Sequence, residues 1–164
     1  MLSRNDIKNL ARLQQKKYRL AEQKFIIEGL RLVIEALRSD WPIELLLMTH
    51  DFSERPPAPA IIAKARQKQI PVYQVPKMEF KKITDTVHSQ GVLAILRMKQ
   101  WEDTPISLFQ KLRRCLFVAI EKLQDPGNLG TIIRTAEWLG ADAAVLGPEC
   151  VEWSNPKALR ASMG

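Results

Sequence analysis

Hydrophobic positions in the first 100 residues switch repeatedly between strand-like and helix-like spacing. Four short apolar runs predict strands, because each is bounded by turn residues and is too short for a helix. These runs cover residues 24–29, 43–48, 72–75 and 91–96. Helical patterns precede, separate or follow them, at residues 3–19, 30–37, from the proline-rich turn at 55–59 up to 69, and 76–83. Strands that alternate with helices predict an α/β domain.

The first helical pattern has two distinct faces. Ser3 followed by Asp6 is typical of a helix start, and the apolar side chains after Asp6 recur at helical spacing. Four basic side chains fall at four- and three-residue steps on another face: Lys8, Arg12, Lys16 and Arg19. This spacing predicts a basic stripe along one helix.

A polar stretch over residues 99–105 loses the periodicity and predicts a linker. After it we expect a helix near residues 106–111, followed by a strand, a helix and a strand over residues 115–120, 129–139 and 143–147. This order is one βαβ unit, which predicts parallel strands with a right-handed crossover. Gly140 stands where a left-handed helix C-terminus belongs. We therefore expect two domains, residues 1–100 and residues 101–164.

The basic excess of the chain belongs to the first of these domains. The whole sequence has 25 Lys and Arg against 18 Asp and Glu, a net charge of +7. Residues 1–100 hold 18 basic and 10 acidic side chains, whereas residues 101–164 hold 7 and 8. A polyanionic partner such as nucleic acid is one explanation, and a well-solvated basic surface is the other.

Several classes of protein are excluded by what the sequence lacks. Cys115 and Cys150 have neither zinc-site spacing nor a disulfide framework, so we expect reduced, buried thiols and no metal. His50 and His88 each stand alone, which argues against an acid–base or metal role. No apolar stretch approaches the roughly 20 residues of a membrane span, and the N-terminus lacks a signal-peptide core. These features predict a cytoplasmic protein without a membrane partner.

The strongest chemical signal is the stretch from Asp125 to Ala136. It follows a predicted strand, and a ligand at the carboxyl end of a parallel strand meets such a turn first. Asn128 could cap the helix or face a substrate. If both are helical, Asn128 and Arg134 lie about 240° apart around the axis, so they converge only if Asn128 sits in the turn. The stretch is neither a dinucleotide fingerprint nor a phosphate-binding Walker loop.

Each residue of this stretch also has an ordinary structural explanation. Arg134 could be a surface cation paired with Glu137 or Asp142. Gly130 could allow close helix–strand packing instead of the approach of a ligand. The apolar positions of the helix, which include Leu139, are those of a buried stripe.

The stretch resembles motif 1 of the SpoU-type RNA 2′-O-ribose methyltransferases, part of the knotted SPOUT superfamily. The pattern D-P-x-N-x-G-x-I-x-R-T-A-x-x-x-G is matched by Asp125, Pro126, Asn128, Gly130, Ile132, Arg134, Thr135, Ala136 and Gly140. Residues 155–164 resemble the family segment N/S-P-K-x-x-R-A-S-M-G. The first domain resembles the family's substrate-binding domain of the ribosomal-protein L30e type, through residues 17–19, 25–29 and 91–94. The resemblance implies an α/β fold in which an L30e-like domain precedes the first part of an α/β-knot methyltransferase domain.

The resemblance also implies transfer of a methyl group from S-adenosylmethionine to a ribose 2′-hydroxyl in rRNA or tRNA. It places Arg134 nearest that oxygen and Asn128 beside the ribose, with Arg160 and Ser162 supporting the site. Because a guanidinium keeps its proton in proteins and is a poor proton acceptor, we expect Arg134 to hold phosphate and stabilise charge on the oxygen. The alternative is a non-catalytic RNA-binding module derived from such an enzyme.

RNA would be held by basic and aromatic side chains of the first domain: Lys16, Lys17, Tyr18, Arg19, Lys24, Lys81 and Lys82. For each of them a solvated basic face is the competing explanation. The family resemblance further implies a homodimer. It also implies that most of the cofactor site lies beyond Gly164, since two later family motifs are not in the sequence. We therefore expect a fragment or a truncated product, inactive on its own.

Overall fold

The computed structural model describes residues 2–99 and 114–163. They fall into two compact units, Met1–Met98 and Lys99–Met163, which we treat separately. The helix expected near residues 106–111 lies outside the described residues, as does most of the expected linker.

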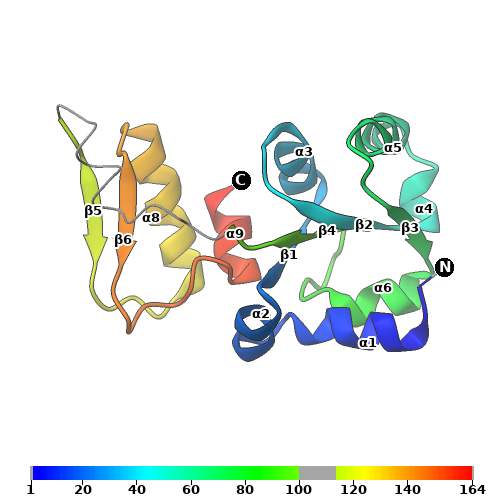
Figure 1. Ribbon diagram of the computed structural model, residues 1–164, viewed down its shortest axis with the longest axis horizontal. Coiled ribbons are helices and arrows are strands. Elements are labelled where there is room, and N and C mark those ends of the chain that lie inside the picture. The colour runs from blue at the N-terminus through cyan, green and yellow to red at the C-terminus, as the bar shows by residue number, and fades with distance from the viewer. Residues whose placement is uncertain (1, 100–113, 164) are drawn as a thin grey trace. The chain divides into compact units, whose positions relative to one another are not determined.

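The first unit is built on a four-stranded mixed sheet (Figure 1). Its strands are β1 (Lys24–Glu28), β2 (Ile43–Thr49), β3 (Val72–Val75) and β4 (Val92–Arg97). The order is β1-β4-β2-β3, with β4 antiparallel to both neighbours and β2 parallel to β3. The predicted α/β fold is confirmed, and all four predicted strands are present.

Helices cover both faces of this sheet. They are α1 (Arg4–Arg12), α2 (Lys16–Glu22), α3 (Leu30–Arg38), α4 (His50–Ser53), α5 (Pro57–Gln67) and α6 (Lys77–Ile83). Figure 1 shows α1 and α6 on one face and α3, α4 and α5 on the other. The predicted start of α1 is confirmed, because the Ser3 hydroxyl accepts from the Asp6 N–H at 3.1 Å and the Asp6 carboxylate accepts from the Ser3 N–H at 2.8 Å.

The core of the first unit fills both sides of the sheet. One side packs against α1 and α6, and its buried residues are Ile7, Leu13, Ile26, Leu45, Leu47, Val75, Phe80, Ile83, Leu93 and Ile95. The intervening strand residues are buried as well, so Val92 to Leu96 form five consecutive buried positions in β4. Burial on both faces explains why β1, β2 and β4 contain continuous apolar runs and not alternating ones.

The second unit contains one βαβ unit and a further helix. Its elements are β5 (Phe117–Ile120), α8 (Pro126–Trp138), β6 (Ala143–Leu146) and α9 (Pro156–Ser162). β5 and β6 pair in parallel from Phe117↔Ala143 onward, which confirms the predicted arrangement. Gly140 has φ +75°, as expected for the residue that ends α8.

Candidate functional site

The first turn of α8 contains the start of the motif that runs from Asp125 to Ala136. Asp125 is its N-cap, and the Asp125 carboxylate accepts from the Asn128 N–H at 2.7 Å. Pro126 has no N–H to leave unsatisfied and favours the first helical position. Asn128 is therefore the third helical residue, so the idea that it caps the helix is wrong. Its side chain is exposed and makes no hydrogen bond to the described residues.

Arg134 lies two turns along α8 and is exposed. The described part of the chain shows no ion pair from Arg134 to Glu137 or Asp142, and the Asp142 carboxylate accepts instead from the Leu116 N–H at 2.8 Å. Because Asn128 and Arg134 both lie within the helix, six residues apart, they are about 240° apart around its axis. The structure therefore does not bring these two side chains onto one face.

Gly130 brings α9 into close contact with α8. A Cβ atom at this position would lie 2.2 Å from the Ala158 carbonyl oxygen and 2.6 Å from Ala161 Cβ. Gly130 thus serves helix–helix packing, not the helix–strand packing that its position predicted. Arg134 follows Gly130 by four residues and so shares its side of α8.

Lys157 is a residue of this region to which the sequence assigned no role. α9 begins at its N-cap Asn155, whose side chain accepts from the Lys157 N–H at 2.9 Å. Lys157 Nζ lies 3.7 Å from Asp125 Oδ2, so the first turns of α8 and α9 are neighbours. The only available signal was its place in the Asn-Pro-Lys string of the second motif.

Arg160 and Ser162 are both half-buried in α9. The Ser162 hydroxyl donates to the Leu159 carbonyl at 2.9 Å, and Arg160 interacts within the chain. Both side chains therefore have a structural role, whatever they add to a site.

The remaining helix positions bring one further correction. Leu129 and Ala136 are buried, but Leu139, expected in the buried stripe, is exposed, as is Trp138 at 89%. The cause is that α8 ends at Trp138, so Leu139 is the C-cap and leaves the helical face.

Arg19 of the first unit is not an RNA contact. Its side chain is 1% exposed, and its guanidinium donates to the carbonyls of Leu13 and Gln14 at 2.8 and 2.7 Å. Leu13 and Gln14 directly follow α1, and carbonyl groups at the end of a helix have no hydrogen-bond partner within it. The predicted basic stripe is therefore wrong, because the chain turns between α1 and α2 and carries Arg19 inward.

Tyr18 forms a basic and aromatic cluster at this turn. The Arg12 guanidinium carbon lies 5.4 Å from the ring centroid and Lys17 Nζ lies 4.8 Å from it, both within cation–π range. Lys16 and Lys17 are exposed and Tyr18 is half-buried. We call Arg12, Lys16, Lys17 and Tyr18 the corner cluster.

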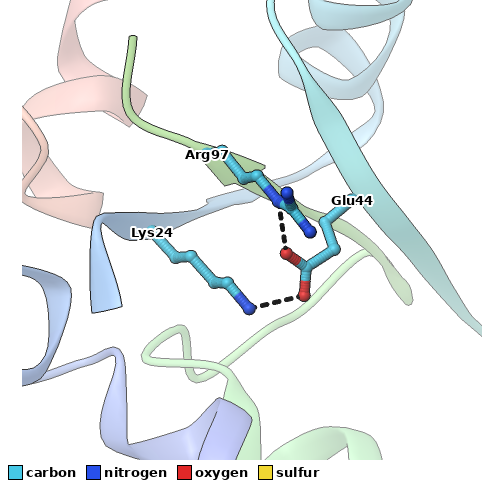
Figure 2. A network of polar contacts seen from close by, with 3 residues as sticks. All are labelled: Lys24, Glu44 and Arg97. Carbon is cyan, nitrogen blue, oxygen red and sulfur yellow. Dashed lines mark hydrogen bonds and ion pairs between the residues drawn. The ribbon is translucent and has the colours of Figure 1, made fainter. Parts of the chain in front are cut away.

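Lys24 belongs to an ion-pair network that joins three strands (Figure 2). Glu44 lies on β2 where the register with β4 shifts, and its carboxylate accepts from Lys24 Nζ at 2.7 Å and from Arg97 Nε at 2.8 Å. Burial would raise the pKa of Glu44, but the hydrogen bonds from Lys24 and Arg97 outweigh it and lower the pKa below its usual value. The structure thus gives Lys24 a role within the sheet.

Lys81 and Lys82 are consecutive in α6 but differ in their surroundings. Lys82 Nζ pairs with Glu79 at 2.8 Å. Lys81 has no ion pair within the described part of the chain and lines a cleft beside the loop that leads to β4. Only Lys81 therefore offers an uncompensated charge.

Other chemistry is limited in the described residues. Across residues 2–99 and 114–163 no three His, Cys, Asp or Glu side chains gather as metal ligands. Both cysteines are free; Cys150 is buried, and its Sγ donates to the Ile120 carbonyl at 3.2 Å. No described helix is long and apolar enough to cross a membrane.

Comparison with protein families divides the chain in the same way. Residues 4–94 match the MRM3-like substrate binding domain, and residues 115–164 match the SpoU rRNA Methylase family. The chain belongs to the SpoU family of RNA methyltransferases. Its SpoU domain is covered only in part, by residues 115–164.

The SpoU relatives are longer proteins. The chain is 34% identical to the Bacillus subtilis 23S rRNA (guanosine(2553)-2′-O)-methyltransferase RlmP, over 96% of this chain and 57% of RlmP. It is 33% identical to a Synechocystis protein named as a tRNA/rRNA methyltransferase, over 96% of this chain and 55% of that protein. The AdoMet-bound rRNA methyltransferase of Sinorhizobium meliloti superposes with a TM-score of 0.82 at 31% identity, covering 100% of this chain and 60% of that one. The chain thus spans about half the length of the curated relatives it matches.

S-adenosylmethionine (AdoMet) is bound in that solved relative. Two glycines of the SpoU segment, Gly130 and Gly147, could leave space for such a cofactor. The space beside Gly130 is occupied by α9, and a Cβ at Gly147 would lie 2.6 Å from the Glu121 carbonyl oxygen. The chain's own backbone therefore occupies both positions, and neither one receives the cofactor.

Proposed function

We propose that this protein acts in the methylation of ribose 2′-hydroxyls of rRNA or tRNA with S-adenosylmethionine as methyl donor. The observation that carries the proposal is Arg134, an exposed guanidinium in the matched SpoU segment, without an ion pair in the described residues and on the α9 side of α8. The basic MRM3-like domain in the same chain supports RNA as the substrate.

Arg134 would act on the substrate as a fixed cation. A ribose hydroxyl must lose its proton as the new bond forms, and a guanidinium cannot accept that proton. It can hold a phosphate through two parallel hydrogen bonds and stabilise negative charge on the 2′-oxygen. The proton then passes to the phosphate or to water.

Asn128 would contact a different group of the same RNA. It lies in the first turn of α8, about 240° around the helix from Arg134, so one atom of the substrate does not meet both side chains. A hydrogen bond from the Asn128 amide to the ribose or to its neighbour would orient the nucleotide.

The first unit would hold the RNA through the corner cluster and Lys81. Among the predicted contacts of this unit, Lys17 and Lys81 have no ion pair within the described residues, whereas Lys24 and Lys82 are paired with Glu44 and Glu79. The two cations over the Tyr18 ring make its role one of positioning charge. The homodimer implied by the family and a cytoplasmic site of action complete the proposal; light scattering tests the first.

The decisive test extends the chain with the C-terminal part of RlmP that it does not cover, and measures transfer of labelled methyl groups from S-adenosylmethionine to 23S rRNA. Arg134→Ala should lower the transfer rate 100-fold or more while RNA binding is kept, by analogy with the loss of one oxyanion-stabilising donor. Arg134→Lys should give an intermediate loss, because a lysine lacks the planar fork.

Arg114→Ala is the matched control, because Arg114 is an exposed arginine of the same unit just before the matched segment. Its transfer rate should be unchanged. Full transfer by Arg134→Ala would remove Arg134 from the mechanism.

A non-catalytic RNA-binding module is the second candidate. It is favoured by the first unit, which matches the MRM3-like substrate binding domain and carries cations without ion pairs in the described residues. In that case the chimera binds RNA, shows no methyl transfer, and releases no heat on titration with S-adenosylmethionine.

A further inference from the structure

A cleft of about 260 Å³ lies in the first unit, beside the loop that joins α6 to β4. Three segments form its walls: the end of β2 with α4 and the residues after it, α6, and the loop over residues 84–91. Its polar lining includes Arg55, Lys77, Lys81, Thr49, Thr86 and Ser89.

The charge of the cleft is positive. Arg55, Lys77 and Lys81 line it, and none of them has an ion pair within the described residues. Asp51 is the one acidic residue among those lining it. Three cations against one carboxylate in one cleft favour an anionic ligand.

The uncharged lining suits a sugar. Thr49, Thr86, Ser89 and Gln90 line the same cleft, together with Phe80 and Val87. The Thr49 and Ser89 hydroxyls each accept one backbone N–H and keep an O–H to donate, while the Thr86 hydroxyl donates to Glu28 and keeps lone pairs to accept. Hydroxyls and amides supply both donors and acceptors, which a ribose 2′-hydroxyl requires. The combination of a cationic rim with a hydroxyl wall is therefore that of a nucleotide site rather than of a site for an inorganic anion alone.

The loop over residues 84–91 is held in place at both ends. The Thr86 hydroxyl donates to the buried Glu28 carboxylate, and the Gln90 side chain accepts from the Leu30 N–H at 2.7 Å. Gly91 has φ +82°, and its carbonyl accepts from the Thr49 N–H at 2.9 Å. Between these anchors Val87 is 88% exposed. Little ordering entropy would be lost on binding, because the wall is already fixed.

The size of the cleft limits the ligand. A volume of about 260 Å³ lies just below the range of about 300–1,000 Å³ that is typical of small-molecule pockets. A duplex groove or an amphipathic helix does not fit such a space, whereas a single unpaired nucleotide does. We propose that this cleft binds one unpaired nucleotide of the substrate RNA, with its phosphate on Arg55, Lys77 and Lys81 and its ribose on the hydroxyl wall. The inference rests on the proposed function, which supplies the RNA.

Two adjacent lysines give a matched test. The 164-residue chain and its variants are titrated with a labelled single-stranded RNA decamer, and binding is followed by fluorescence anisotropy at several salt concentrations. Lys81→Ala should weaken binding about fivefold and reduce the salt slope by about 1, because one phosphate contact is lost. Lys82→Ala removes the same charge from the same helix but one already neutralised by Glu79, so its affinity should change less than twofold.

A second titration locates the ligand without a substitution. Amide NMR shifts of the 164-residue chain are followed on addition of adenosine 5′-monophosphate, and of inorganic phosphate for comparison. The nucleotide should move Thr49, Gln90 and Gly91 and should move them further than phosphate does. Equal shifts with the two ligands would reject the ribose contact, and shifts confined to the corner cluster would reject the cleft.

The outcomes separate this inference from the proposed function. RNA binding with equal affinity for Lys81→Ala, Lys82→Ala and the unmodified chain overturns the cleft and leaves the methyltransferase proposal standing. No RNA binding by any form, with no methyl transfer by the chimera, overturns the proposed function and the cleft with it.

Discussion

The two units differ in how completely their sheets are covered. In the first, β4 has five consecutive buried residues and helices on both faces of a four-stranded sheet. In the second, β5 and β6 form a two-stranded sheet on which no residue is fully buried, and Val145 is 49% exposed. Two-stranded sheets alone are marginally stable, so the first unit holds most of the folding stability of the described residues.

The proposed chemistry is divided in the opposite way. The well-packed unit carries the basic side chains assigned to RNA binding, and the less covered unit carries Asn128 and Arg134. A rigid platform suits positioning of a large substrate, because little order has to be acquired on binding. The SpoU segment depends instead on close contacts such as that of α8 with α9 at Gly130.

The largest contrast should come from truncating one strand residue in each unit. Leu93→Ala in β4 removes a side chain that is 0% exposed and should cost about 3 kcal/mol of unfolding free energy. Val145→Ala in β6 should cost less than about 1 kcal/mol, because half of that side chain already meets water. Urea unfolding with hydrogen exchange of each strand measures both. Equal losses would show that the second unit is as tightly packed as the first.

The same difference explains what could be predicted from the sequence. The third strand, Val72–Val75, was predicted to the residue, because two prolines bound a short run of β-branched and aromatic residues, although this edge strand is only partly buried. Arg19 was misassigned, because the turn after Leu13 has no glycine or proline to mark it. Only the folded chain shows the guanidinium reaching back to the end of α1.

The sequence predicted the helix that carries the motif but not its start. The helix expected over residues 129–139 is Pro126–Trp138, and Asp125 took the capping role considered for Asn128. Periodicity could not show that Gly130 faces another helix, because that contact joins segments about 30 residues apart in the sequence. Convergence of Asn128 and Arg134 required a turn at Asn128, and the helix begins before it.

Two glycines of the second unit, Gly130 and Gly140, differ in how closely other atoms approach them. Gly130→Ala places a methyl group 2.2 Å from a carbonyl oxygen of α9, so the helices must separate, at about 2–3 kcal/mol. Gly140→Ala meets nothing within 4 Å and pays only for its positive φ, about 1 kcal/mol. Thermal unfolding gives both values, and methyl transfer by the chimera should fall only for the first. A Gly140→Ala loss as large as that of Gly130→Ala would refute the packing role.

The last prediction concerns the ion-pair network at Glu44 in the first unit. Glu44→Gln removes the charge that joins Lys24 and Arg97 and should cost about 1 kcal/mol at pH 7, since the network is partly exposed. The pKa of Glu44 is lowered in the fold from its ordinary 4.5, so its contribution is complete above that pH and is lost as the pH falls through the lower folded value. The difference in urea midpoint between Glu44→Gln and the unmodified chain should therefore shrink below pH 4.5. A difference independent of pH would assign the effect to packing.

The two thiols of the second unit differ in a way that can report on its motions. Cys115 is half-buried, while the Cys150 Sγ is enclosed and donates to the last residue of β5. An alkylating reagent should therefore label Cys115 first and reach Cys150 only when the end of β5 separates from the segment before α9. The ratio of the two alkylation rates, followed by mass spectrometry, therefore reports local opening of the SpoU segment without a substitution in the chain.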